Sequence, residues 1–160
     1  MAETLGSLCD KLSIVKLKQY HCDNEQKAQS LATQEGQLVA EMNSFLADAI
    51  SGQKPVERLS FSANKVYKQV GNELCPVPEG SIGEAFAELS KVNCDLWHEQ
   101  EKVYEFEAVP AEEKNKVVKQ LALLNLRRNQ CIDAIDKVLM RSVECILRSK
   151  SAASVAAPTY

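Results

Sequence analysis

The segment from residue 111 to residue 149 constrains the fold of this chain more than any other. Apolar residues recur along it at alternating steps of three and four, which places their side chains on one face of a long helix. A stripe sustained over this length predicts packing against neighbouring helices in the manner of a coiled coil. The residues of the stripe are Val117, Leu121, Leu124, Cys131, Ile135, Val138 and Cys145.

Two segments before this one carry the same helical period. The first extends from about residue 4 to residue 26, and the second from residue 38 to residue 50, with Gly52 predicting its end. The break between them is poorly marked. Residues 23–24 and 33–36 are both candidates, and a single bent helix is the alternative.

A third helix is predicted from residue 81 to about residue 109. Ser81 and Glu84 have the spacing of a capping box, in which the hydroxyl and the carboxylate each satisfy a free amide of the first turn. The apolar stripe of this helix comprises Ile82, Ala85, Phe86, Leu89, Val92, Leu96 and Val103.

The remaining segments are a connector and a tail. Residues 52–80 contain a weaker helical period between residues 56 and 74, which predicts one short helix before a proline-rich end. Residues 151–160 are rich in Ala, Ser and Pro and are predicted to be disordered. We therefore predict an all-α protein, a four-helix bundle with a short connector helix, in a single domain over residues 1–150.

An internal repeat suggests how the bundle is built. Residues 4–21 align without a gap on residues 81–98, and Tyr20 falls opposite Trp97. The alternative is that any two amphipathic helices look alike. A true repeat predicts two duplicated helical hairpins, residues 3–51 and 81–149, related by a pseudo-twofold axis. The identical pairs are Gly6 and Gly83, Leu12 and Leu89, Ser13 and Ser90, Val15 and Val92, and His21 and His98.

Composition excludes several classes of function. The chain is 45% hydrophobic and 26% charged, with a net charge of -3 and scattered Lys and Arg residues, so neither a disordered chain nor a nucleic-acid-binding protein is expected. No apolar run is long enough for a membrane span, and residues 1–4 do not begin a signal peptide. The six cysteines are widely spaced, which favours reduced thiols and a cytoplasmic protein over a disulfide or zinc framework.

Two motifs of the second half resemble a known family. Leu96-Trp97-His98 with Glu101 in one helix is followed by the segment 124–136, Leu-Asn-Leu-Arg-Arg-Asn-Gln-Cys-Ile-Asp-Ala-Ile-Asp, in the next. The pair resembles a bacterial helical family of unknown function, recognisable by a Leu-Trp-His-x-Glu helix and a Leu-Asn-x-x-Arg-Asn-x-x-Ile-x-x-Ile-Asp helix. The resemblance covers about residues 83–139 and departs from the family in the connector. It implies a link to glycan and lipopolysaccharide genes, without an agreed activity.

Arg128 is the residue that most suggests a site, because it lies on the apolar stripe of the last helix. A buried guanidinium needs a partner, and Glu101 or Glu99 on the preceding helix is the expected one. A satisfied polar layer, a site for an anionic group such as phosphate, and a solvated Arg are the three interpretations. The candidate ligand-binding residues are Arg128, Asn125, Asn129, Asp136, Glu101 and His98.

The two histidines are candidate metal ligands. His98 and Glu101 have the spacing of half a carboxylate-bridged metal site, but His21 and His98 both fall opposite the core stripes of their helices. The inward stripes of the first two helices are expected to contain no carboxylate. We therefore predict no metal site, and outward histidines beside Tyr20 and Trp97 that are either plain surface residues or part of a subunit interface.

No catalytic signature or cofactor motif is complete. The chain has neither a glycine-rich phosphate loop nor a nucleophile elbow. Helical nucleotide pyrophosphatases hold magnesium with acidic pairs on two helices, and the pairs here, Glu84 with Glu88 and Asp133 with Asp136, match that pattern incompletely.

The function that we predict is non-enzymatic. The chain is expected to be a self-associating helical binding or accessory protein that holds a small anionic ligand, such as a nucleotide or sugar phosphate, near Arg128. The alternative is a divalent-metal-dependent enzyme acting on a nucleotide or sugar nucleotide.

Overall fold

The computed structural model describes residues 2–61, 77 and 80–155 of the chain. Within that part it contains four α-helices, two short 3-10 turns and no β-strand, which confirms the all-α prediction. The elements in chain order are α1 (Leu5–Tyr20), α2 (Glu25–Ser51), η1 (Val56–Arg58), α3 (Ile82–Tyr104), η2 (Phe106–Ala108) and α4 (Ala111–Val155).

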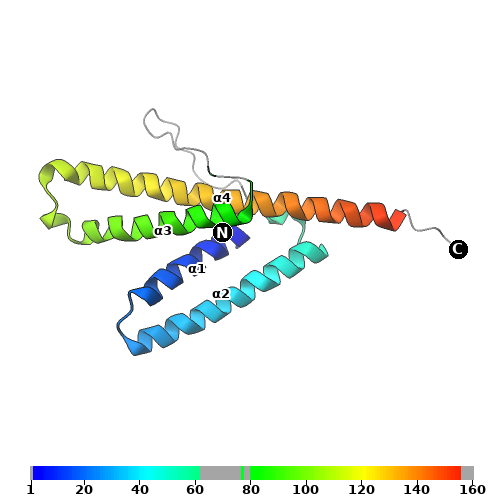
Figure 1. Ribbon diagram of the computed structural model, residues 1–160, viewed down its shortest axis with the longest axis horizontal. Helices are drawn as coiled ribbons and strands as arrows, with labels where there is room; N and C mark the ends of the chain where they lie inside the picture. Colours follow the sequence, from blue (N-terminus) through cyan, green and yellow to red (C-terminus); the bar gives the residue numbers. More distant parts are fainter. Residues whose placement is uncertain (1, 62–76, 78–79, 156–160) are drawn as a thin grey trace.

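The four helices form two antiparallel hairpins, α1 with α2 and α3 with α4 (Figure 1). Helix α1 lies between α2 and the second hairpin, and it contacts α2 as well as both α3 and α4. The hairpins diverge toward their loops and meet near the start of α1. Because α1 is in contact with all three other helices, its side chains decide how the two hairpins are joined.

The ends of α1 and α2 follow from local capping. Thr4 and Ser7 form a reciprocal capping box at the start of α1. Asn24 caps α2 by accepting from Lys27 N at 2.9 Å, so the break lies at residues 23–24. Residues 33–36 are inside α2, and a single bent helix is wrong. Gly52 ends α2 in the left-handed region, at φ 82°.

Helix α3 begins as predicted and ends early. The Ser81 hydroxyl accepts from Glu84 N at 3.1 Å, which is the hydroxyl half of the expected capping box. The helix stops at Tyr104 rather than near residue 109, because a separate 3-10 turn, η2, precedes Pro110. The proline cannot continue a helix but is well tolerated before the first turn of α4.

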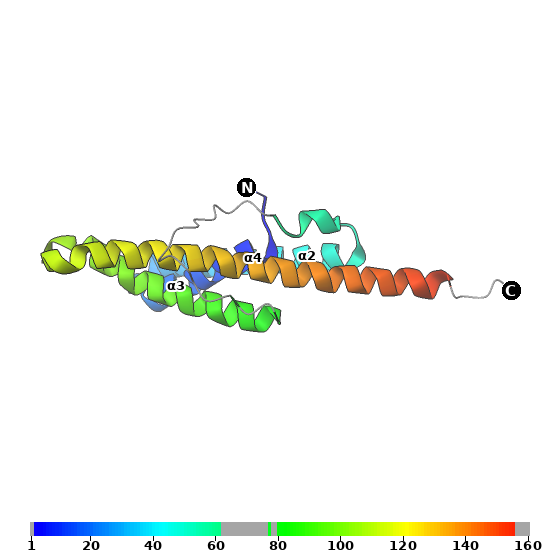
Figure 2. The ribbon, with the colours of Figure 1, turned by 90° about the horizontal axis from the view of Figure 1, so that it is seen from above.

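Helix α4 is longer than predicted. It extends along the whole molecule and past the other helices at its C-terminal end (Figure 2). Residues 151–155, expected in the disordered tail, are its last residues, and residues 156–160 lie outside the described part. In the connector, only η1 of the expected short helix is seen, since residues 62–76 also lie outside the described part.

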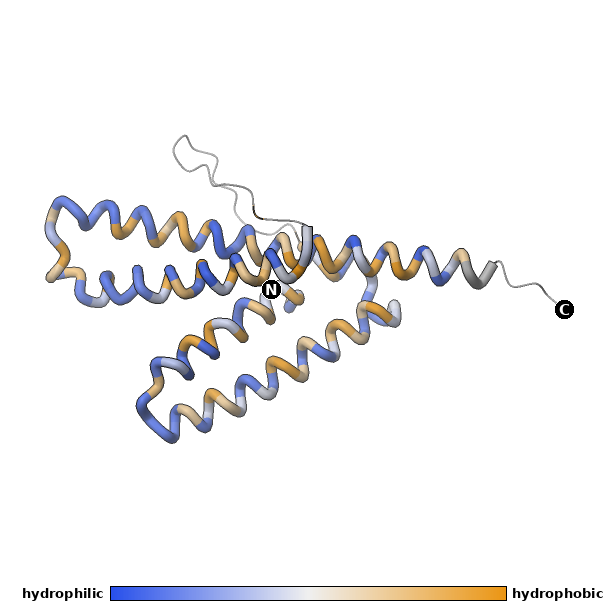
Figure 3. The backbone as a smooth tube through the Cα atoms, viewed as in Figure 1, coloured by the Kyte–Doolittle hydropathy of each residue, from blue (hydrophilic) through white to orange (hydrophobic). Residues whose placement is uncertain are grey.

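The buried apolar residues of the four helices form one core. Apolar positions recur along each helix (Figure 3). Of the predicted stripe of α4, Val117, Leu124, Cys131 and Ile135 are buried, whereas Leu121 and Val138 are half-buried and Cys145 is exposed. Beyond Ile135 the buried positions continue through Leu139 and Val143, because α4 there leaves α3 and meets η1 and the end of α2. No helix of the described residues has the length and apolar character needed to cross a bilayer.

The internal repeat stays a prediction. The two hairpins differ in their surroundings as well as in helix length. Gly6 is buried against α4 whereas Gly83 is exposed, and Tyr20 is 85% exposed whereas Trp97 is half-buried.

Candidate ligand site at the junction of three helices

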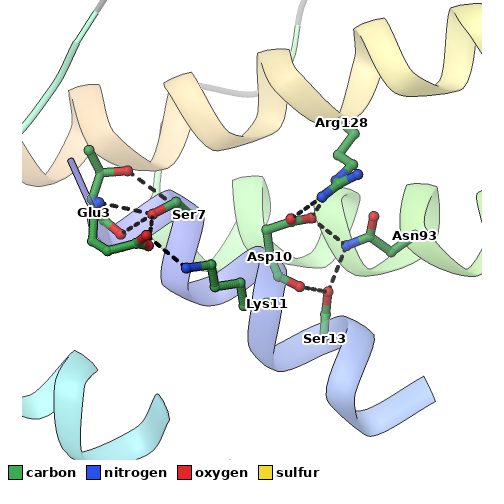
Figure 4. Close-up of polar contacts among 8 residues, drawn as sticks. Glu3, Ser7, Asp10, Lys11, Ser13, Asn93 and Arg128 are labelled. Atoms are coloured by element: carbon green, nitrogen blue, oxygen red, sulfur yellow. Dashed lines mark hydrogen bonds and ion pairs between the residues drawn. The ribbon is translucent and has the colours of Figure 1, made fainter. Parts of the chain in front are cut away.

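Arg128 of α4 forms an ion pair with Asp10 of α1 (Figure 4). Its Nε donates to Asp10 Oδ1 at 2.7 Å, and one Nη donates to Oδ2, so the contact is bidentate. The Asp10 side chain is 6% exposed and that of Arg128 is 34% exposed. Hydrogen bonding to Asp10 raises the pKa of Arg128 against the effect of burial, so the guanidinium is held in its charged form.

Asn93 of α3 joins the same layer. Its Nδ2 donates to Asp10 Oδ1 at 2.9 Å and to Ser13 Oγ at 2.6 Å, while the Ser13 hydroxyl donates to the Asp10 carbonyl at 2.8 Å (Figure 4). Asn93 is completely buried, and its Oδ1 has no hydrogen-bond partner in the described structure. We call Asp10, Ser13, Asn93 and Arg128 the polar layer. It joins α1, α3 and α4.

The prediction that a carboxylate pairs with Arg128 is confirmed, but the expected partners are wrong. Glu101 is exposed and accepts from Trp97 Nε1 at 3.0 Å, and Glu99 Oε1 accepts from Lys102 at 2.8 Å. Both lie on α3, whose face toward Arg128 presents Asn93 instead. The carboxylate comes from α1, so the polar layer ties the first hairpin to the second.

The apolar stripes of the first two helices contain no carboxylate, as expected, but α1 nevertheless buries one next to its stripe. Asp10 lies on a face of α1 with Gly6 and Ser13, beside the apolar stripe rather than on it. Asn93 could have been found, because it is spaced four residues after Leu89 and three before Leu96. Arg128 was identified by the same criterion, a polar residue at a position of an apolar stripe.

A groove between α1, α3 and α4 opens over the polar layer. It has a volume of about 750 Å³ and includes three of the predicted site residues, Arg128, Asn125 and Glu101. Asn125 is exposed and donates to the Leu121 carbonyl of its own helix at 3.0 Å. We call this cavity the α1–α3–α4 groove. Its other lining residues are Ile14, Lys18, Asn93, Leu96, Trp97, Gln100, Tyr104 and Leu121.

Two further predicted residues, Asn129 and Asp136, line a second cavity of about 480 Å³ beside the start of α1. Arg128 lines this cavity as well, so it borders both. Asp136 Oδ1 accepts from Gly6 N at 2.7 Å and thereby satisfies a free amide in the first turn of α1. The helices are so close here that a Cβ at Gly6 would overlap the Ile132 carbonyl.

The carboxyl group of Asp136 has a raised pKa. Burial raises the pKa of its carboxyl from 3.8 to about 6, although hydrogen bonds from the Gly6 amide and the Thr4 side chain act in the opposite direction. The nearby charge of Asp133 raises this pKa further. Asp136 is 3% exposed and serves as a structural cap between α4 and α1.

The histidines are both exposed, as predicted. His98 lies outside the two cavities, with Nδ1 3.4 Å from Glu101 Oε2. His21 stacks on Trp97 with ring centroids 4.9 Å apart and an interplanar angle of 9°, and Tyr20 packs edge-on against His21. This aromatic edge joins the end of α1 to α3, and the subunit interface that we expected there stays a prediction.

The other ionisable groups of the described part form no metal cluster. Glu88, one of the acids compared with magnesium-binding pairs, forms an ion pair with Arg127 at 2.8 Å. Burial raises the pKa of the Cys9 and Cys131 thiols to about 11, which makes both poor nucleophiles.

No family model, curated protein or solved structure matches this chain significantly. The resemblance to the bacterial helical family therefore stays a prediction.

Proposed function

We propose that this chain is a non-enzymatic binding protein that holds a small anionic organic ligand, such as a nucleotide or a sugar phosphate, in the α1–α3–α4 groove. The observation that supports this most is the composition of the groove, which combines polar side chains from three helices with an apolar and aromatic wall. Small-molecule sites typically have volumes of about 300–1,000 Å³ and the same combination of walls and few polar groups. The groove, at about 750 Å³, has a suitable size.

An anionic group of the ligand would be attracted by the cationic side chains of the groove. Lys18 and Arg128 contribute two positive charges, against the single carboxylate of Glu101. Because Arg128 is paired with Asp10, Lys18 on the exposed rim supplies most of the attraction.

We also propose a cytoplasmic location and self-association. The five described cysteines are free thiols, which suits a reducing compartment. Tyr20, 85% exposed beside the His21–Trp97 stack, suits an aromatic contact between two copies of the chain. Light scattering after size-exclusion chromatography should show a dimer that Tyr20→Ala weakens. A monomeric parent protein would contradict the proposal.

A thermal-shift panel of nucleotides, sugar phosphates and divalent metals tests ligand binding. A ligand that binds only the folded state stabilises it by about 2.7 kcal/mol at a hundred times its Kd. Trp97 is the single tryptophan of the chain and lines the groove, so its fluorescence reports the same event.

Two lysines of α1 provide a matched pair of variants. Lys18→Ala should weaken binding, whereas Lys16→Ala should not, because Lys16 pairs with Glu35 of α2 at 3.1 Å and does not line the groove. Stabilisation by a divalent metal alone would favour the enzyme alternative. A panel without any hit, or equal effects of the two variants, would contradict the binding proposal.

A further inference from the structure

We infer that the ligand is a mononucleotide, with its base in the α1–α3–α4 groove against Trp97 and its phosphate in a neighbouring cavity beside Lys18 and Lys27. This inference rests on the binding function proposed above. It adds the class of the ligand and the place of its two ends.

The neighbouring cavity lies where α1 ends and α2 begins, and we call it the α1–α2 loop cavity. It has a volume of about 370 Å³. Lys18 of α1 and Trp97 of α3 line both this cavity and the α1–α3–α4 groove, so the two adjoin at these side chains. A molecule with two parts can therefore occupy both. The other lining residues of the α1–α2 loop cavity are His21, Cys22, Asp23, Lys27, Ser30 and Leu31.

The excess of positive charge lies in the α1–α2 loop cavity. Lys18 and Lys27 line it against the single carboxylate of Asp23, and neither lysine has an ion pair within the described part of the chain. In the α1–α3–α4 groove, Arg128 is neutralised by its buried partner, and the carboxylate of Glu101 offsets the charge of Lys18. A phosphate is attracted to the place where cations outnumber carboxylates. The phosphate of the ligand therefore belongs in the α1–α2 loop cavity.

The α1–α3–α4 groove suits a flat ring. Trp97 is held by its stack on His21 and by the 3.0 Å hydrogen bond from Nε1 to Glu101, but it is only half-buried, so part of its surface is accessible. Tyr104, 79% exposed, adds a second aromatic side chain to the wall. A base gains free energy by stacking on such side chains, and a wall that is already ordered lowers the entropy cost of binding.

Two exposed amides of the groove match the edge of a base. Gln100 Nε2 donates to the Tyr104 hydroxyl at 3.3 Å, and Asn125 Nδ2 donates to the Leu121 carbonyl at 3.0 Å. Each amide keeps its oxygen and one N–H hydrogen for a further partner. The edge of a base presents donors and acceptors side by side, which such an amide can pair with. A sugar phosphate without a base has no aromatic ring for this wall, so we favour the nucleotide.

Isothermal titration calorimetry of the parent protein tests the class of ligand. The probes are AMP, GMP, CMP and UMP, ribose 5-phosphate, and the nucleoside of the tightest-binding nucleotide. That nucleotide should bind about 5- to 10-fold more tightly than ribose 5-phosphate, because only the nucleotide has a base to stack on Trp97. It should also bind more tightly than its nucleoside, by a factor that falls as the salt concentration rises, because only the nucleotide carries a phosphate.

Variants of Trp97 and Lys27 locate the two ends of the ligand. Trp97→Leu should weaken the nucleotide by about 5- to 10-fold and ribose 5-phosphate by less than about 2-fold, whereas Trp97→Phe should weaken the nucleotide less than Trp97→Leu does. Lys27→Ala should weaken both compounds by about 2- to 5-fold. Lys16→Ala is the matched control, because Lys16 pairs with Glu35 and lines neither cavity, and it should change neither affinity.

The outcomes separate this inference from the proposed function. If ribose 5-phosphate binds as tightly as the nucleotides, or if Trp97→Leu weakens both compounds equally, the base does not stack on Trp97. If a nucleotide and its nucleoside bind equally, or if Lys27→Ala changes neither affinity, the phosphate is misplaced. Either result overturns the inference while binding in the groove stands. If none of the probes binds, both proposals fail. If Trp97→Leu does not fold, the ligand series on the parent protein decides alone.

Discussion

Replacing Arg128 by Ala should cost far more stability than replacing its partner Asp10. In Arg128→Ala, the Asp10 carboxylate stays in a site where its side chain is 6% exposed, and of the three hydrogen bonds that reach it only the one from Asn93 remains. Breaking a buried pair in this way costs about 3–5 kcal/mol. Since the Arg128 side chain is 34% exposed, water can follow into the vacated space, and we expect a value near about 3 kcal/mol.

The reverse change leaves a cation that can reach water. In Asp10→Ala, the Arg128 side chain can turn from its partly exposed position toward the groove, and Asn93 keeps its bond to Ser13. We expect a cost of about 1 kcal/mol, which is typical of a lost hydrogen bond whose donor becomes solvated. The double variant Asp10→Leu with Arg128→Met should be close to neutral, because neither charge then remains buried.

Urea unfolding followed by circular dichroism measures this cycle, with the slope of the transition checked for constancy. Arg148→Ala is the control, since Arg148 is 84% exposed and lies 4.0 Å from Glu144, and it should change stability by less than about 0.5 kcal/mol. Equal costs for the two single variants, or an unfolding midpoint of Arg128→Ala equal to that of the parent protein, would refute the reasoning.

Three further outcomes follow from the described contacts. Gly6→Ala should destabilise the protein by about 1–3 kcal/mol in urea unfolding, because its Cβ would overlap the Ile132 carbonyl. Gly83→Ala, at an open helix position, should stabilise it by up to about 1 kcal/mol. Two changes in unfolding free energy of the same sign would contradict this. Because the folded pKa of Asp136 is raised from 3.8 to about 6, protonation stabilises the fold, fully below pH 3.8 and progressively less as pH rises through 6. The change amounts to about 3 kcal/mol and should vanish in Asp136→Asn, so identical pH profiles of the two proteins would rule it out. Maleimide labelling with mass spectrometry should modify exposed Cys145 before buried Cys131, and the opposite order would show that the end of α4 is misplaced.

Short-range features were predictable because each depends on residues within one or two turns of helix. The Ser81 cap and the Gly52 end of α2 required only local hydrogen-bonding rules and the backbone freedom of glycine. The period of the last segment likewise predicted that Leu124, Cys131 and Ile135 are buried.

The helical period of the apolar stripe does not predict burial correctly where α4 changes the helix against which it packs. Cys145 continues the spacing of the stripe but is exposed, because the end of α4 packs on η1 and α2 instead of α3. The sequence of one helix does not contain the position at which the neighbouring helix ends. The shift of the buried face to Leu139 and Val143 is a consequence of that tertiary contact.

The same division applies to the candidate site. The sequence alone determined that Arg128 needs a carboxylate, because the cost of burying a lone charge depends only on the charge and its surroundings. Tertiary structure alone decided that the carboxylate is Asp10. That choice depends on α1 lying between α2 and the α3–α4 hairpin, and on the close approach at Gly6 that brings α1 against α4. The position and crossing of helices far apart in the chain are set by the packing of all of them together, so no single helical period contains this information.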